Sequence, residues 1–159
     1  MGRFLSERFA LHAALAQERD AGRSIVFTNG VFDMLHAGHV RSLAGAATLG
    51  DVLVVGINDD ASVRRLKGEK RPIVPLEQRA EVLVALASVS YVVAFSEDTP
   101  EKLIREVRPD ILAKGEDYAD KEVVGADFVR ANGGRVELIP LVAGVSTTDL
   151  VLEILRRYR

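Results

Sequence analysis

The sequence predicts an α/β domain in which a parallel sheet of five strands is covered by helices on both faces. Short apolar runs alternate with segments of helical periodicity along the chain. The runs are continuously apolar, which is typical of strands buried on both faces, whereas a strand with one face in water alternates apolar and polar residues. Strands that alternate with helices in turn predict crossover connections between parallel neighbours.

The predicted strands are five apolar or β-branched segments, bounded by helices and turn residues. They are residues 24–28 (SIVFT), 51–57 (DVLVVGI), 91–95 (YVVAF), 110–114 (DILAK) and 135–140 (RVELIP). The predicted helices have apolar residues near helical spacing or a helix-forming composition between turn signals. They are residues 5–21, 38–49, 60–66, 76–87, 100–107, 121–131 and 147–157.

Several local signals justify the helix ends. Gly22 and Gly50 stand where the first two helices should stop. Thr99-Pro100 combines a helix-capping residue with proline at the first helical position. Asn132-Gly133-Gly134 closes the helix that precedes the last strand. Gly22, Gly50 and the Asn132-Gly133-Gly134 turn each stand just before a predicted strand.

Length and composition indicate one globular domain of residues 1–159, with residues 1–22 as a helical extension and 24–155 as the core. A net charge of −2 lacks the basic footprint of a nucleic-acid binder. The absence of cysteine excludes disulfides and cysteine-based zinc sites, and fits a cytoplasmic protein. Because no apolar run approaches 18 residues, a membrane partner is not expected.

Ligands of parallel sheets bind outside the carboxyl ends of the strands. The first such loop lies in TNGVFDMLHAGHV, residues 28–40, where His36 and His39 stand at i, i+3 on one helical face. Gly38 between them permits close approach by a ligand, and the helix N-terminus supplies unpaired N–H groups. The segment predicts an anion site for phosphate; a plain helix cap and a metal site, which would need a third ligand, are the alternatives.

Three further loops carry candidate residues. In GVSTTDL (144–150), hydroxyl side chains and Asp149 fit either a capping box or a phosphate cradle at a helix N-terminus. The basic loop KGEKRP (67–72) fits either neutralisation of a triphosphate or a solvated loop. AKGEDY (113–118) offers acids for ribose hydroxyls or a simple turn. No GxGxxG follows the first strand and no P-loop is present, which disfavours dehydrogenases and P-loop kinases.

Together, TNGVFDMLHAGHV, KGEDY and VSTT (145–148) resemble the motifs of the cytidylyltransferase-like nucleotidyltransferases, in the same order. The resemblance implies a Rossmann-like domain with the HxGH nucleotidyltransferase fold. Residues 24–155 look like the D-glycero-β-D-manno-heptose 1-phosphate adenylyltransferases, with RLKGEKRPIVPLEQR and FSEDTPEKLI as added matches. The chain departs from the glycerol-phosphate cytidylyltransferases, because LVAGVSTT lacks their arginine and SVSYVV replaces their RYVDEV.

The resemblance implies transfer of AMP from ATP to heptose 1-phosphate, with ADP-heptose and pyrophosphate as the products. It implies that Mg²⁺ binds together with ATP, and that the ADP-heptose serves lipopolysaccharide synthesis. It also implies the stand-alone form of an enzyme that is often joined to a kinase, and a homodimer. A cytidylyltransferase for another phosphorylated alcohol, such as glycerol 3-phosphate, and a non-catalytic nucleotide sensor are the alternative functions.

The resemblance also assigns roles to residues. His36 and His39 hold the triphosphate and stabilise charge in the transition state, while Lys67, Lys70 and Arg79 contact the β- and γ-phosphates. The remaining candidates line the nucleotide site or bind its phosphates and ribose: Thr28, Asn29, Gly30, Phe32, Gly38, Gly115, Asp117, Ser146, Thr147 and Thr148. Asp33 orients the sugar phosphate or a metal-bound water.

Overall fold

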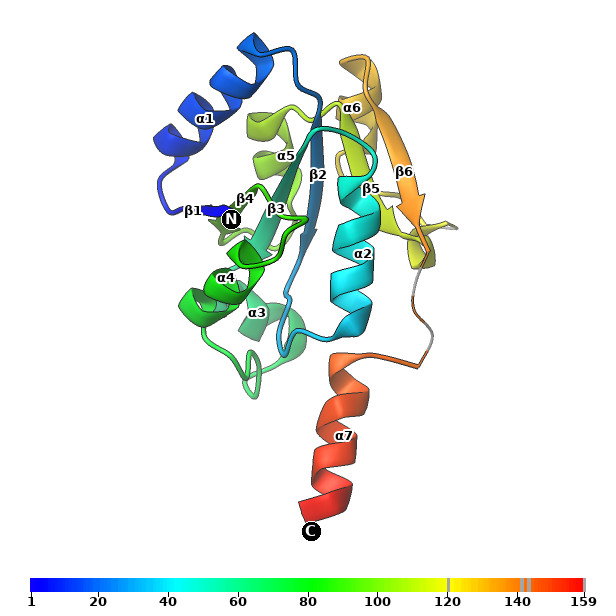
Figure 1. Ribbon diagram of the computed structural model, residues 1–159. Helices are drawn as coiled ribbons and strands as arrows, with labels where there is room; N and C mark the ends of the chain where they lie inside the picture. Colours follow the sequence, from blue (N-terminus) through cyan, green and yellow to red (C-terminus); the bar gives the residue numbers. More distant parts are fainter. Residues whose placement is uncertain (120, 141, 143, 159) are drawn as a thin grey trace.

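A computed structural model describes residues 1–119, 121–140, 142 and 144–158. The described strands form one parallel sheet in the order β1-β4-β3-β2-β5-β6 (Figure 1). The strands are β1 (Arg3–Leu5), β2 (Ile25–Gly30), β3 (Val52–Asn58), β4 (Tyr91–Phe95), β5 (Ile111–Gly115) and β6 (Arg135–Ile139). The helices are α1 (Arg8–Asp20), α2 (Ala37–Ala47), α3 (Asp60–Lys67), α4 (Leu76–Val84), α5 (Glu101–Val107), the 3-10 turn η1 (Glu116–Tyr118), α6 (Ala126–Ala131) and α7 (Thr147–Tyr158).

The predicted fold class is confirmed, and the strand count is corrected from five to six. The extra strand is β1, which pairs in parallel with β4 at the edge of the sheet. Its residues overlap the start of the predicted first helix, which begins only at Arg8. A three-residue strand is too short to show a period of two, so the helical periodicity that follows it dominates the sequence signal.

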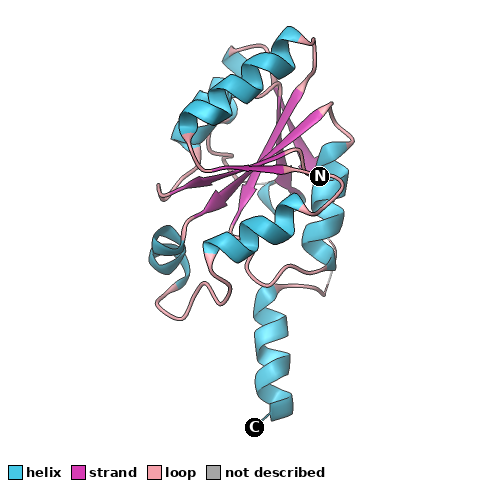
Figure 2. Cartoon of the chain, turned by 60° about the vertical axis from the view of Figure 1, so that its left-hand side comes forward, coloured by secondary structure: helices cyan, strands magenta, loops and turns pink. Residues whose placement is uncertain are grey.

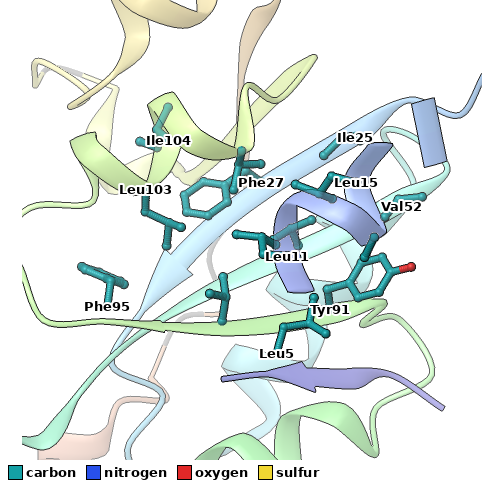
Figure 3. Packing of buried hydrophobic residues seen from close by; sticks show 14 of the residues in the cluster. Leu5, Leu11, Leu15, Ile25, Phe27, Val52, Tyr91, Phe95, Leu103 and Ile104 are labelled. Carbon is teal, nitrogen blue, oxygen red and sulfur yellow. The ribbon is translucent and has the colours of Figure 1, made fainter. Parts of the chain in front are cut away.

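Two hydrophobic clusters lie on opposite faces of the sheet, and successive residues of β2 alternate between them. On one face, Ile25 and Phe27 pack with Leu11 of α1 and Leu103 of α5 (Figure 3). On the other face, Val26 packs in the cluster that holds the buried apolar side chains of α2 and α4. Figure 2 shows helices on both sides of the twisted sheet, as the continuously apolar strands predict.

The strand order reverses between β2 and β5. From β2 the chain builds outward through β3 to β4, and then returns to add β5 and β6 on the other side. The connections that leave β2 and β5 therefore diverge at their carboxyl ends, which opens a crevice for a ligand. The motif around His36 and the KGEDY turn follow these two strands.

Helix α7 extends away from the sheet (Figures 1 and 2), and none of its described residues is buried. Only its first turn lies beside the domain, where the Thr147 hydroxyl donates to the backbone carbonyl oxygen of Asp33. No helix within the described part of the chain is long and apolar enough to cross a membrane.

Candidate active site

A pocket of about 780 Å³ opens at the carboxyl ends of β2 and β5. The predicted site residues among its described lining come from both sides of the strand-order reversal and from the start of α7. They are Thr28, Asn29, Gly30, Phe32, Asp33, His36, Gly38, His39, Lys67, Gly115, Asp117, Ser146, Thr147 and Thr148. Lys70 and Arg79 are not among the described lining residues. Residue 120, which follows the KGEDY turn, and residues 141 and 143, which precede GVSTTDL, lie outside the described part.

The two histidines stack at the N-terminus of α2. Their ring centroids are 3.8 Å apart with an interplanar angle of 26°, and Phe32 lies against His39 at 5.3 Å. His36 is the N-cap, and its Nδ1 accepts a hydrogen bond of 3.1 Å from the Gly38 N–H. Because Nδ1 accepts, a neutral His36 carries its proton on Nε2, which is a donor for a ligand. A Cβ on Gly38 would approach His36 Cε1 to 2.9 Å, so this cap favours glycine.

Both imidazoles are biased towards their neutral form. Burial lowers the pKa of His39 to about 4, with a further lowering by His36 that Asp33 partly opposes. Burial also lowers the pKa of His36. His39 Nδ1 is buried and has no hydrogen-bond partner among the described residues. The pair can therefore offer N–H donors to an anion at neutral pH without carrying positive charge.

The backbone between β2 and α2 is strained. Phe32 and Met34 have φ values of 51° and 53°, in the left-handed region that non-glycine residues seldom adopt. Such conformations persist where surrounding contacts impose them, and they gather at functional sites. Here they flank Asp33, a buried residue that is 1% exposed.

The Asp33 carboxylate anchors the basic loop. It accepts hydrogen bonds of 2.9 Å from the backbone N–H groups of Ile73 and Val74, and one of 2.5 Å from Arg71 Nε. Burial opposes its ionisation, but these donors outweigh burial and hold the pKa of Asp33 below its usual value. Both carboxylate oxygens therefore accept hydrogen bonds from residues 71–74. The sequence prediction had Asp33 orient the sugar phosphate or a metal-bound water instead.

Arg79 is buried at 2% exposure and ties several loops together. Its guanidinium donates to the carbonyl oxygens of Val74, Val31 and Asn58, and to the carboxylate of Asp60. The predicted phosphate contact of Arg79 does not fit this geometry, because the side chain is enclosed by these acceptors and does not line the pocket. Its place in the fold is a clamp on the loops that follow β2 and β3.

The other basic side chains differ in their position. Lys67, the last residue of α3, is exposed and lines the pocket. Arg71 is half-buried and also lines the pocket. Lys70 is exposed on the loop beyond them. Of the basic loop, Lys67 and Arg71 thus lie where an anionic ligand would reach them.

The start of α7 shows one half of the predicted capping box, the cap by the Ser146 hydroxyl. Ser146 Oγ accepts from the Asp149 N–H at 3.0 Å and donates to the Asp149 carboxylate at 2.7 Å.

The N-termini of α2 and α7 border the same pocket. Each contributes unpaired N–H groups and a partial positive charge, so the two together suit a polyphosphate.

Lys114 is a site residue that the sequence prediction missed. It is 8% exposed, lines the pocket and bonds through Nζ to the side-chain oxygen of Asn29. Burial lowers the pKa of Lys114 to about 8, which Asp117 partly opposes. Its signal in the sequence is a lysine at the end of the apolar run DILAK. That signal gains meaning only once β5 is known to lie beside β2.

The cytidylyltransferase-like family matches residues 27–150. The bifunctional protein HldE of Syntrophotalea carbinolica is 55% identical over 151 residues, which cover 95% of this chain and 31% of the relative. HldE of Halorhodospira halophila is 57% identical over 147 residues, with 92% and 31% covered. The chain thus spans about a third of the length of these curated relatives.

Among solved structures, a lipopolysaccharide core biosynthesis protein from Thermoplasma volcanium superposes with a TM-score of 0.61 at 31% identity. The match covers 76% of this chain and 98% of that protein. The family match includes the stacked histidines, the turn after β5 and the α7 capping box, which all border one pocket. The chain therefore belongs to the cytidylyltransferase-like family and is a nucleotidyltransferase.

Proposed function

We propose that this chain transfers AMP from ATP to D-glycero-β-D-manno-heptose 1-phosphate, giving ADP-heptose and pyrophosphate. The observation that carries the transfer chemistry is the pair of helix N-termini, α2 and α7, at one pocket with the neutral His36–His39 stack. Support for the heptose comes from the identity to HldE and from the likeness to a lipopolysaccharide core biosynthesis protein.

In the proposed reaction, an oxygen of the sugar phosphate attacks the α-phosphorus of ATP in line. The bond from that phosphorus to the bridging oxygen breaks, and pyrophosphate leaves with the electron pair. A phosphate monoester is already ionised at neutral pH, so no general base is needed. The protein's part is to position the two phosphates and to stabilise the charge that develops.

His36 and His39 donate N–H groups to the phosphates, and their charge stabilisation grows as pyrophosphate departs. At the second helix N-terminus, Thr148 adds a hydroxyl donor and Ser146 adds its backbone N–H. Lys67 contacts the β- and γ-phosphates. Asp117 contacts the ribose. Asp33 and Arg79 act as positioning residues, because they hold the basic loop and the turn after β2 in place.

Mg²⁺ enters in this proposal with ATP. Within the described residues no three His, Asp or Glu side chains are grouped to hold a metal ion. That lining fits a magnesium ion held mainly by phosphate oxygens and water, as nucleotide-bound Mg²⁺ usually is. When bound, the ion neutralises charge on the leaving pyrophosphate.

The proposal is tested by pyrophosphate release with ATP, CTP, GTP and UTP, each against heptose 1-phosphate in both anomers, glucose 1-phosphate and glycerol 3-phosphate. We expect ATP with the β-anomer of heptose 1-phosphate to give the highest kcat/KM, with ADP-heptose identified by mass spectrometry. Activity only with CTP and glycerol 3-phosphate would replace this assignment. Nucleotide binding without release from any pair would favour a sensor.

His39→Ala tests the transition-state role separately from the choice of substrate. Loss of one preorganised donor should lower kcat about a hundred- to thousandfold while the protein stays folded.

We also propose a homodimer, as the resemblance implies, and light scattering after gel filtration measures its mass.

A further inference from the structure

Lys114 occupies the point where the strand order reverses. It lies at the carboxyl end of β5, and β5 pairs directly with β2. Its Nζ reaches the side-chain oxygen of Asn29 on β2. In parallel sheets this reversal is the place where ligands bind, and Lys114 and Asn29 both line the pocket there.

The charges around the pocket give Lys114 a distinct place. The cationic side chains of the described lining are Lys67, Arg71 and Lys114. Lys67 is exposed and Arg71 is half-buried, whereas Lys114 is buried. Lys114 is therefore the cation that is held out of bulk water, where attraction to an anion is stronger than at the surface.

Asn29 completes the arrangement. Because its side-chain oxygen accepts from Lys114, the amide nitrogen of the same side chain remains as a donor. An ammonium and an amide N–H next to each other match the oxygens of a phosphate group, which accept several hydrogen bonds. A charge-assisted contact of this kind is stronger than one between neutral groups.

We propose that Lys114 and Asn29 form a phosphate subsite at the carboxyl ends of β5 and β2, separate from the helix N-termini. The inference rests on the proposed function in so far as the phosphate belongs to one of the two substrates. That phosphate is either the α-phosphate of ATP or the phosphate of the acceptor, and binding measurements distinguish the two sources.

The test compares wild type with Lys114→Met, which keeps the length of the side chain and removes its charge. Calorimetry measures binding of ATP, of heptose 1-phosphate and of inorganic phosphate, each alone. We expect Lys114→Met to weaken one of them by about ten- to hundredfold, the usual effect of losing a hydrogen bond to a charged group. Loss for ATP alone assigns the subsite to the nucleotide; loss for the sugar phosphate and inorganic phosphate assigns it to the acceptor.

Lys114→Arg keeps the charge and should retain affinity better than Lys114→Met. Lys102→Met is the matched control, because Lys102 is an exposed lysine on α5 that pairs with Glu97 outside the pocket. Folded Lys114→Met that binds all three ligands as wild type does would overturn the proposal. If wild type is inactive towards heptose 1-phosphate, the proposed function is wrong. The subsite is then still tested, because the affinities of wild type and Lys114→Met for ATP and inorganic phosphate can be compared all the same.

A second measurement covers a variant that does not fold. Because the pKa of Lys114 is about 8, wild-type affinity for the subsite's ligand should fall as pH rises from 7 to 9. Lys67, Asp117 and the histidine pair line the same pocket. The pKa values of both histidines are lowered from 6.5, so neither histidine changes charge in this range. Affinity for all three ligands that stays flat over this range would also overturn the proposal.

Discussion

The Thr147 hydroxyl donates a hydrogen bond of 2.7 Å to the backbone carbonyl oxygen of Asp33. This contact joins two motifs that lie 114 residues apart in the chain. It brings the first turn of α7 against the strained turn after β2. A Cβ on Gly38 would lie 3.5 Å from the Val145 carbonyl oxygen, so the two segments also pack closely at the start of α2.

Thr147→Val should separate the contribution of this bond from the shape of the side chain. Valine fills the same space without the hydroxyl, so the Asp33 carbonyl loses its partner and the two helix N-termini are less firmly held. We expect the free energy of unfolding to fall by about 1 kcal/mol and kcat/KM to fall about tenfold. Urea denaturation and steady-state kinetics measure the two effects. Thr147→Ser, which keeps the hydroxyl, should behave like wild type; equal losses in both variants would argue against the bond.

Asp33→Asn should weaken the anchor of the basic loop. The amide cannot match the carboxylate as acceptor for Ile73, Val74 and Arg71, so stability at pH 7 should fall by about 1–3 kcal/mol. The folded-state pKa of Asp33 lies below 3.8, so the stability that it contributes is present above pH 3.8 and is lost as pH falls through the folded-state value. Asp33→Asn should therefore lose less stability than wild type on acidification.

The control for that variant is Asp98→Asn. Asp98 pairs with Arg65 at the surface, where its side chain is 62% exposed, and such pairs contribute little. Denaturation curves from pH 7 down to pH 3 compare the three proteins. If Asp33→Asn and Asp98→Asn followed the wild-type curve equally, Asp33 would not anchor the loop.

The features that sequence predicts well here depend on local patterns. Continuous apolar runs place β2 to β5. The HAGH and STT motifs each stand at a helix start, where capping chemistry is readable within a few residues. The strand β1 is too short to carry a pattern. It forms because it finds the edge of β4, which is a property of the sheet and not of its own residues.

The partners of charged side chains depend on tertiary structure. Asp33 lies in a motif that suggests a ligand contact, and only the folded chain shows that the loop 71–74 returns to it. In the sequence, Arg79 is one more basic residue after the basic loop. In the folded chain it is buried and donates to acceptors in the loops that follow β2 and β3. Lys114 gains its neighbour Asn29 only through the pairing of β5 with β2. A single sequence contains no signal for these three relationships.

Arg79→Met distinguishes a clamp from a phosphate contact. Removal of the guanidinium leaves the carbonyl oxygens of Val31, Asn58 and Val74 without this donor and breaks the pair with Asp60. We expect a loss of about 3–5 kcal/mol in the free energy of unfolding, which denaturation measures. Arg79→Lys should recover little, because an ammonium cannot reproduce the fork of the guanidinium. If Arg79→Met had normal stability but a raised KM for ATP, Arg79 would contact phosphate as the sequence predicted.

The pH dependence of His39 follows from its lowered pKa. Because the folded-state pKa is about 4 against an ordinary 6.5, neutral His39 prefers the folded protein. Its contribution to stability is full above pH 6.5 and is lost as pH falls from 6.5 towards 4. An NMR titration of the ring protons, assigned with His39→Gln, should give a midpoint near the lower value. A midpoint at or above 6.5 would mean that the site uses a charged imidazolium.

Lys67→Ala and Lys70→Ala form a matched pair that tests where the basic loop acts. Lys67 lines the pocket, whereas Lys70 is exposed and outside the described lining. If the loop keeps this position with ATP bound, Lys67→Ala should raise the KM for ATP about tenfold through loss of a charged contact, and Lys70→Ala should change it less than about twofold. An equal rise in the KM for ATP in both variants would show that the loop closes over the nucleotide during turnover, because only a moved loop brings Lys70 to the phosphates. Unchanged kinetics in both variants would reduce the loop to a solvated surface.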